Sequence, residues 1–159
     1  MSTLENNKQL IDIFYQGLAS LDAQAMSNCY HAEAVFSDPV FGKLNYAEVT
    51  TMWQLLLRSK DLKIQFQINS INEKSAKVYW QADYVYGKNK RKIHNRIKSL
   101  IQFREGKIYR HTDRFSLWKW AGQAMGFNGT LIGWTSFFRK RLQTQSKQML
   151  ERYISKTKK

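Results

Sequence analysis

Residues 103–115 read FREGKIYRHTDRF, and this stretch decides how the chain folds. Glu105 and Gly106 predict a tight turn between two strands, because glycine accepts the backbone angles that such turns require. Side chains two positions apart on a strand point to the same face of the sheet. The strand that leaves the turn is therefore expected to carry an imidazole and a carboxylate between aromatic rings on one face: Tyr109, His111, Asp113 and Phe115.

Three further strands are predicted upstream of this turn, because apolar and polar residues alternate there. Together with the strand after the turn, they form an antiparallel meander of four strands. The alternating apolar residues are Leu62, Ile64, Phe66 and Ile68, then Val78, Trp80, Ala82 and Tyr84, then Ile93, Ile97, Ile101 and Phe103.

The strand around Trp80 has large side chains on both faces. We expect one set to point into the domain and the other to point outward: Tyr79, Gln81 and Asp83 inside, and Val78, Trp80 and Tyr84 outside. An exposed apolar patch of that size usually meets a partner. The sequence therefore predicts a homodimer that forms through the outer face of the sheet.

The first third of the chain has the three-to-four-residue spacing of helices. The first helix has one apolar stripe, made by Ile11, Phe14, Tyr15, Leu18 and Leu21. Asp22 can cap a second, short helix through Cys29 and Tyr30, and Asn45 with Glu48 predicts a capped third helix. Three helices followed by four strands predict an α+β domain over residues 1–118, with the helices on the concave face of a curved antiparallel sheet.

Residues 119–159 are expected to form a basic helical extension packed on the same domain. Trp120 to Phe138 contains no charged residue, but its glycines and polar side chains make it unsuitable for crossing a membrane. Its glycines are Gly122, Gly126, Gly129 and Gly133. Either they form a smooth face for close helix packing, or residues 126–129 form a turn between two helices.

The formal net charge of +14 is spread unevenly along the chain. Residues 1–57 hold two basic and six acidic residues, so the remainder carries +18. Two basic clusters, residues 87–98 and 137–159, are suited to an anionic membrane or to nucleic acid. A solvated basic surface is the other interpretation of the same charge.

The composition also limits the kinds of site. Cys29 is the only cysteine, so a disulfide within the chain and a site with paired thiolates are excluded, and a cytoplasmic location is expected. The histidines, His31, His94 and His111, lack the spacing of metal ligands. We therefore expect neither a metal nor a cofactor.

From Leu10 to Trp118, the order of elements and two motifs resemble the SnoaL-like branch of the nuclear transport factor 2-like superfamily. EAVFSDPVFG, residues 33–42, is similar to the segment that carries the general base of ketosteroid isomerases, and Asp38 matches that base. FREGKIYRHTDRF is similar to the last hairpin of the family. Limonene-epoxide hydrolases have an inward aspartate there, which Asp113 matches. The resemblance implies a cone-shaped domain that encloses a pocket.

Some family positions hold other residues in this chain. Asp83 falls where the hydrolases have their second carboxylate, but Gln81 stands in place of the arginine paired with it. The tyrosine and aspartic acid of the isomerase oxyanion hole fall on Phe14 and Ser99. Loss of one such donor costs roughly 10²–10³ in rate, so steroid isomerisation is rejected unless Tyr15 supplies a donor.

The predicted catalytic residues are Asp38, His111 and Asp113, since a histidine beside a carboxylate can move a proton. The same pair would equally suit a structural network in the core. The predicted pocket wall consists of Phe14, Tyr15, Trp53, Tyr79, Gln81, Asp83, Ser99, Tyr109 and Phe115.

Two functions remain open at this point. One is a pocket for a small apolar ligand, with isomerase, cyclase or hydrolase chemistry that needs no cofactor. The other is a non-catalytic scaffold whose basic C-terminal helix contacts an anionic membrane or nucleic acid.

Overall fold

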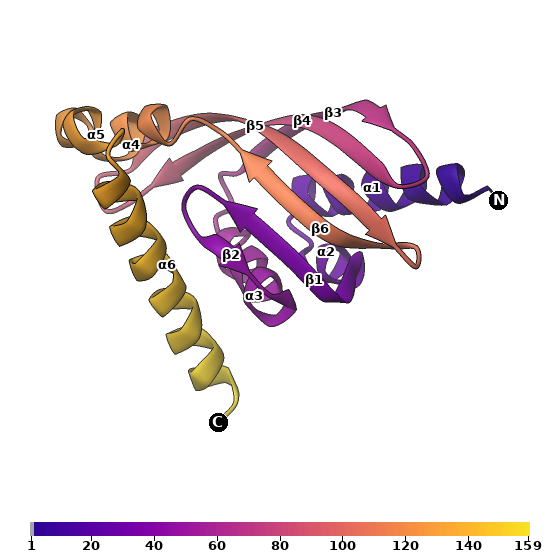
Figure 1. The fold of residues 1–159 in the computed structure, drawn as a ribbon. Coiled ribbons are helices and arrows are strands. Elements are labelled where there is room, and N and C mark those ends of the chain that lie inside the picture. Colours follow the sequence, from indigo (N-terminus) through magenta and orange to yellow (C-terminus); the bar gives the residue numbers. More distant parts are fainter. Residues whose placement is uncertain (1) are drawn as a thin grey trace.

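A computed structural model describes residues 2–159, which form six helices and six strands. Figure 1 shows the course of the chain. The elements in chain order are α1 (Thr3–Ala19), α2 (Ala23–Asn28), β1 (Tyr30–Asp38), β2 (Gly42–Leu44), α3 (Tyr46–Leu56), β3 (Lys63–Ile71), β4 (Ser75–Tyr86), β5 (Arg91–Arg104), β6 (Lys107–Arg114), α4 (Leu117–Met125), α5 (Phe127–Ile132) and α6 (Ser136–Thr157).

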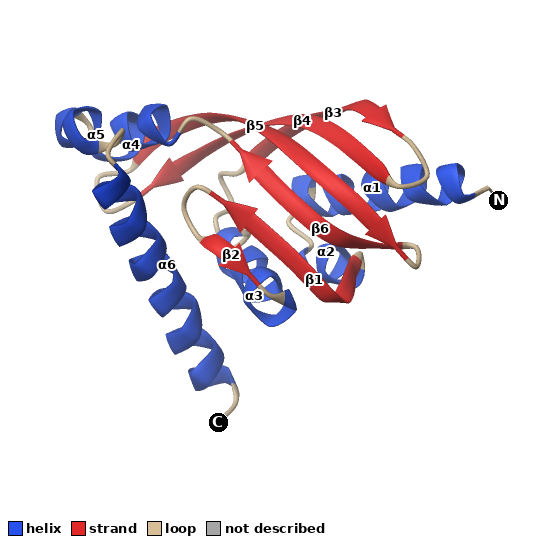
Figure 2. Cartoon of the chain, viewed as in Figure 1, coloured by secondary structure: helices blue, strands red, loops and turns tan. Residues whose placement is uncertain are grey.

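The strands form one curved sheet in the order β2-β1-β6-β5-β4-β3. Helices α1, α2 and α3 lie on the same face of this sheet, as Figure 2 shows. The main core lies between these helices and the sheet, and most of the buried apolar side chains belong to it. The predicted α+β cone is confirmed.

The predicted helix signals are present at the helix starts. In α3, the Asn45 side chain accepts from the Glu48 backbone N–H at 2.9 Å, and Glu48 accepts from the Asn45 N–H at 3.1 Å. Asp22 accepts from the backbone N–H of Ala25 and so caps α2. These bonds satisfy N–H groups that have no partner within the helix.

The sheet has two strands more than the four of the predicted meander. The predicted second helix ends at Asn28, and Tyr30 instead begins β1, which pairs in parallel with β6. Phe36 lies opposite His111 in this register, and Ser37 lies opposite Thr112. The segment around Asp38 is therefore held beside the strand that carries Asp113.

The predicted faces of β4 are wrong. Val78, Trp80 and Ala82 are buried against the helices, whereas Tyr79 is 41% exposed. Aromatic rings occur on both faces of this strand, so its alternation gave no clear polar side. The residues cited for a homodimer thus lie inside the domain, and the homodimer remains a prediction without that support.

The position of Tyr109 also differs from the prediction. Ile108 pairs with Phe103, but Arg110 pairs with Gln102, so a β-bulge leaves Tyr109 without a partner residue in the ladder. A bulge shifts the alternation of faces by one residue. Ile108 is buried in its place, and the Tyr109 ring packs on His31 of the opposite face.

The C-terminal helices are joined closely to the rest of the domain. Gly126, with φ at +67°, ends α4, which supports a turn at this glycine. The four glycines therefore do not share the face of one continuous helix, although Gly129 of α5 lies so close to Ala121 of α4 that a β-carbon would overlap the Ala121 carbonyl. Farther along, Leu150 of α6 is fully buried in the main core. Between residues 2 and 159, no helix combines the length and the apolar composition that a membrane span needs.

Replacing Gly129 with alanine is expected to destabilise the α4–α5 pair, because the added methyl group must displace the Ala121 backbone. Forced overpacking costs about 1–3 kcal/mol. Thermal unfolding followed by circular dichroism measures the effect. Asn128→Ala, at an exposed position of the same helix, is the control. Equal melting temperatures for the two variants would contradict the close packing.

Replacing Leu150 with alanine is expected to lower the free energy of unfolding by about 2–5 kcal/mol, the cost of a cavity in a packed core. Denaturant titration checks this value, with the exposed neighbour Gln148→Ala as the matched control. If Leu150→Ala were as stable as Gln148→Ala, α6 would be an appendage that the core does not need.

Candidate functional site

A cavity of about 370 Å³ lies between the inner face of the sheet, α3, α4 and α6. Its wall is mostly apolar, and among the described residues that line it only Asp38 and Asp113 are charged. Leu56, Tyr86 and Met149 line the cavity and are also exposed to solvent, so they mark its mouth. The site therefore suits a small apolar ligand that offers a polar group to the carboxylates.

The parallel pairing of β1 with β6 brings the two carboxylates together. Asp38 follows Phe36 by two residues, and Asp113 follows its partner His111 by two residues. Alternation places both aspartates on the same face as the Phe36 and His111 rings, whose centroids are 5.1 Å apart. Two acidic groups from distant parts of the chain thus share one floor of the cavity.

A chain of buried hydrogen bonds reaches Asp113 from the β4 side. Trp80 donates from Nε1 to the Ser99 hydroxyl at 2.8 Å, and Ser99 donates to Asp113 Oδ1 at 2.5 Å. The indole nitrogen can only donate, so the Ser99 proton is free to point at the carboxylate. This side of the network holds Asp113 as an acceptor.

A second chain reaches the same oxygen from the helices. Trp53 donates from Nε1 to the Tyr30 hydroxyl at 3.1 Å, and Tyr30 lies 2.8 Å from His111 Nδ1. His111 Nε2 lies 2.8 Å from Asp113 Oδ1, and since a carboxylate oxygen only accepts, Nε2 is the nitrogen that carries the proton. Nδ1 of the neutral ring is then the acceptor for the Tyr30 hydroxyl.

Both chains end on Oδ1 of Asp113, which leaves the other carboxylate oxygen for the cavity. No described residue donates a hydrogen bond to Oδ2. Asp113 is therefore fixed in orientation, and because this residue lines the cavity, Oδ2 is the oxygen left to meet a ligand. A fixed and accessible carboxylate oxygen has the geometry of a general base.

Asp38 has a different environment. Its Oδ1 accepts from the backbone N–H groups of Val40 at 2.9 Å and Phe41 at 2.6 Å. Burial, with the nearby Asp113 charge as a smaller contribution, raises the pKa of Asp38 to about 7 even though these two N–H groups act to lower it. Close to neutral pH, Asp38 is thus divided between its acidic and basic forms.

Tyr84 also presents a hydroxyl to the cavity. Its oxygen accepts from Trp120 Nε1 at 2.9 Å, so its own proton can point at a ligand. Burial raises the pKa of Tyr84 to about 12, and the hydroxyl therefore stays protonated at neutral pH.

The structure brings several of the predicted site residues together. Asp38, Asp113, Trp53 and Phe115 line the cavity. Behind this lining lie His111, Ser99, Phe14 and Tyr15, all buried. The Tyr15 hydroxyl is buried without a hydrogen-bond partner among residues 2–159, and Tyr15 does not line the cavity.

The other predicted wall residues lie elsewhere. Tyr79, Gln81 and Asp83 are on the outer face of β4, where Asp83 lies 2.7 Å from His94 Nδ1. Tyr109 is turned away by the bulge. No cluster of three or more histidine, cysteine or acidic side chains among residues 2–159 is arranged to hold a metal ion.

The sequence pattern does not point to Tyr30, to Tyr84 or to the part of α6 that lines the cavity. It predicts a helix at Tyr30 and an outward direction for Tyr84, whereas Tyr30 begins β1 and Tyr84 lines the cavity. The wall from α6 consists of Leu142, Gln145, Ser146 and Met149. The spacing of these residues at three and four positions was a usable signal for a helix face that packs against something.

Solved structures with the same fold come from several bacteria. A candidate polyketide cyclase of Xanthomonas campestris is 14% identical, with a TM-score of 0.63, over 77% of this chain and 98% of that one. A candidate isomerase of Bacillus subtilis is 16% identical, with a TM-score of 0.64, over 79% of this chain and 96% of that one.

An epoxide hydrolase of M. tuberculosis, described as LEH-like, is 12% identical, with a TM-score of 0.61, over 83% of this chain and 94% of that one. At such identities these likenesses concern the fold alone. No curated protein matches the sequence.

A family model gives the relationship at the level of sequence. Residues 11–111, well over half of the chain, match the model of the SnoaL-like domain. The match contains the second half of α1, all of α2 and α3, most of the sheet, and the segment with Asp38. This protein belongs to the SnoaL-like family of the nuclear transport factor 2-like superfamily.

Proposed function

We propose that this protein is a cofactor-independent enzyme of the isomerase or cyclase type, which moves a proton on a small, apolar carbonyl compound. One observation carries the proposal: two carboxylates in different environments share the floor of an apolar cavity. Pairs of acidic groups with different proton affinities are a common basis for acid and base roles in one site.

Asp113 is the proposed base. Its Oδ2 removes a proton from the carbon next to the carbonyl group of the ligand, and the C–H electron pair forms the enolate. His111 and Ser99 hold Oδ1, so they position the carboxylate without contacting the ligand. The chemistry then ends either with return of the proton to another carbon, as in an isomerase, or with attack of the enolate carbon on a second carbonyl, as in a cyclase.

Asp38 and Tyr84 are the proposed partners of the carbonyl oxygen. With a pKa near 7, Asp38 is present in a protonated form that can donate to the developing oxyanion. The Tyr84 hydroxyl supplies a second donor. These groups take the place of the oxyanion-hole donors of the isomerases, whose positions hold Phe14 and Ser99 here.

Hydrolysis of an epoxide is less well supported. Asp83, which matches the second hydrolase carboxylate, pairs with His94 on the outer face of the sheet. Gln81, in the position of the hydrolase arginine, is on that face as well. Only one of the three hydrolase positions therefore lines the cavity. We further propose a cytoplasmic location, which suits the single free thiol of Cys29.

Asp113→Asn is expected to reduce proton exchange by about 10²–10⁴-fold, the usual contribution of a general base. The assay is nuclear magnetic resonance of deuterium uptake next to the carbonyl group in a panel of apolar cyclic ketones. The control is Asp83→Asn, which removes a carboxylate from the outer face. Exchange as fast in Asp113→Asn as in this control would contradict the role of Asp113.

The raised pKa of Asp38 predicts in which direction the free energy of unfolding changes with pH. Its pKa is about 7 in the folded state and 3.8 as its ordinary value, so between these pH values the folded protein binds more protons than the unfolded chain. The contribution of Asp38 to the free energy of unfolding therefore falls as pH rises through this window and levels off above about pH 7.

The comparison for this dependence is Asp38→Asn, which keeps an oxygen for the N–H groups of Val40 and Phe41. Relative to this variant, the wild type should lose stability from pH 4 to 7, as measured by denaturant titration. Parallel curves for the two proteins across this range would show that Asp38 ionises normally.

A further inference from the structure

Large apolar side chains are exposed at the end of the molecule that lies farthest from the N-terminus. Phe127, Trp134 and Phe137 are 76%, 75% and 72% exposed, and Leu131 and Ile132 are about half exposed. They belong to α5 and to the segment that enters α6. Figure 1 shows α4, α5 and the start of α6 together at one end of the fold. We call these five residues the apolar tip.

The packing of α5 explains why these side chains face outward. Helix α5 contacts α4 through Gly129, which lies against the Ala121 backbone. Glycine thus makes the internal contact, while the phenylalanine, leucine and isoleucine of the same helix are left on the surface. A helix that served only the core would place its large apolar side chains inside. The arrangement favours a partner that receives apolar side chains.

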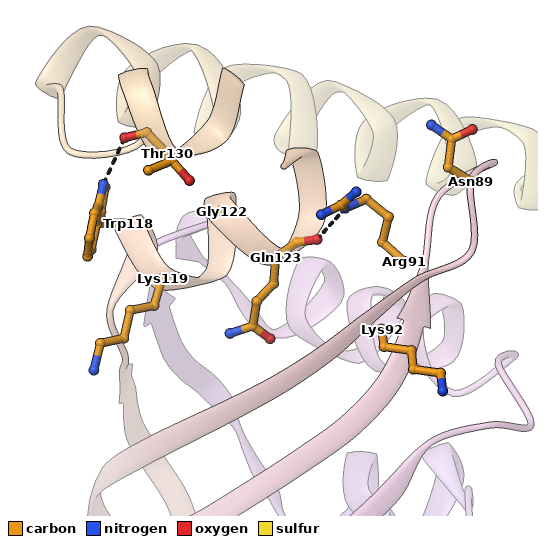
Figure 3. A pocket seen from close by; sticks show the side chains of 8 residues that line it. All are labelled: Asn89, Arg91, Lys92, Trp118, Lys119, Gly122, Gln123 and Thr130. Carbon is orange, nitrogen blue, oxygen red and sulfur yellow. Dashed lines mark hydrogen bonds between the residues drawn. The ribbon is translucent and has the colours of Figure 1, made fainter. Parts of the chain in front are cut away.

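Basic residues lie close to the helices that carry the apolar tip, and the Arg91 guanidinium lies beside Gly126, the residue before Phe127. Figure 3 shows Arg91, Lys92 and Lys119 around a groove between β5 and the α4–α5 pair. Arg91 donates to the Gln123 backbone oxygen at 2.6 Å, which fixes the β5 end beside α4. Three more basic residues follow the tip directly in α6: Arg139, Lys140 and Arg141.

Acidic residues are few in this part of the chain. Between residues 84 and 150 they are Glu105 and Asp113. Glu105 lies in the β5–β6 turn beside His31, and Asp113 is buried at the cavity. Asp83, just before this range, faces His94 on the outer sheet face. The basic residues near the apolar tip are therefore not neutralised by any carboxylate between residues 84 and 150.

We propose that this end of the molecule, the apolar tip with its surrounding basic residues, docks the protein onto an anionic phospholipid bilayer. Aromatic and aliphatic side chains enter the interfacial region, and each basic residue near the surface adds electrostatic attraction. The protein lies on the membrane and does not cross it.

The hydrogen bonds of two tryptophans, Trp134 in the apolar tip and Trp118 in α4, suit this environment. The indole N–H of Trp134 donates to the Leu131 backbone oxygen at 3.0 Å, and that of Trp118 donates to the Thr130 oxygen at 2.9 Å. Both rings can therefore leave water without an unpaired N–H group, whose burial would otherwise cost free energy. Tryptophan is also enriched at membrane interfaces.

The chemistry of the tip favours a bilayer over two other occupants. Nucleic acid would use the basic residues and the aromatic rings, but it has no use for Leu131 and Ile132. A two-fold dimer formed tip to tip would bring two basic ends together without acidic residues between them, which like-charge repulsion opposes. An anionic bilayer matches both the apolar and the basic side chains.

The experiment is co-sedimentation of the full chain with vesicles of phosphatidylcholine alone, or of phosphatidylcholine and phosphatidylglycerol at about three to one. The wild type is expected to bind the mixed vesicles, to bind the neutral ones weakly, and to lose affinity as salt is raised. The triple variant Phe127→Ser, Trp134→Ser, Phe137→Ser should bind the mixed vesicles at least about tenfold more weakly. Because these side chains are exposed, their removal should leave the fold intact.

The control removes three exposed apolar side chains elsewhere: Ile13→Ser, Tyr46→Ser and Tyr79→Ser. This control should bind as the wild type does. Equal binding of the tip variant and the control would overturn the proposal. So would tip-dependent binding to duplex RNA with none to vesicles, or tip-dependent dimerisation in sedimentation velocity without lipid. Since none of these readouts involves turnover, a failure here is separate from a failure of the proposed function.

Discussion

The hydrogen bond between His111 and Asp113 is the contact on which the arrangement of the core depends. It joins two chains of donors that begin at indole nitrogens and end on one carboxylate oxygen. The members come from β1, α3, β6, β5 and β4. Buried polar groups are costly unless they are paired, so each of these elements has to be in its place for the others to be satisfied. The polar network thereby acts together with the backbone ladders and the apolar packing to fix the relative positions of these strands.

The same network separates the roles of two aspartates that share a cavity. Asp113 receives donors from side chains on both sides of it, and these donors are themselves fixed by the core. Asp38 receives two backbone N–H groups from the turn that follows β1, in a place where burial opposes its charge. Identical side chains thus differ because one is held by a network and the other by a loop. The two aspartates are close because β1, near the start of the sheet in the chain, pairs in parallel with β6, its last strand.

Much of this fold could be predicted from local patterns. The helix caps at Asp22 and Asn45 and the inward direction of His111 and Asp113 follow from spacing and residue type. The faces of β4 could not be predicted, because Tyr79 and Trp80 gave both sides an aromatic character. The bulge at Tyr109 and the pairing of β1 with β6 depend on contacts between distant residues, which single-strand periodicity does not contain. Local sequence patterns therefore predict where Asp38 and Asp113 lie, whereas the residues around them depend on contacts between distant parts of the chain.

Helix α6 lies beyond the residues that match the family model, yet it forms part of the cavity wall. Asp38 and the core of the cone lie within the matched region, whereas Leu142, Ser146 and Met149 come from the extension. The mouth of the cavity thus combines Leu56 and Tyr86 of the matched region with Met149 of α6, whereas both carboxylates of the floor come from strands or the loop beside them. In evolution, a change of the terminal helix could alter which molecules fit while the carboxylates and their supports stay the same. Substitutions on the cavity-facing side of α6 can therefore change ligand preference without changing the side chains that hold the two carboxylates.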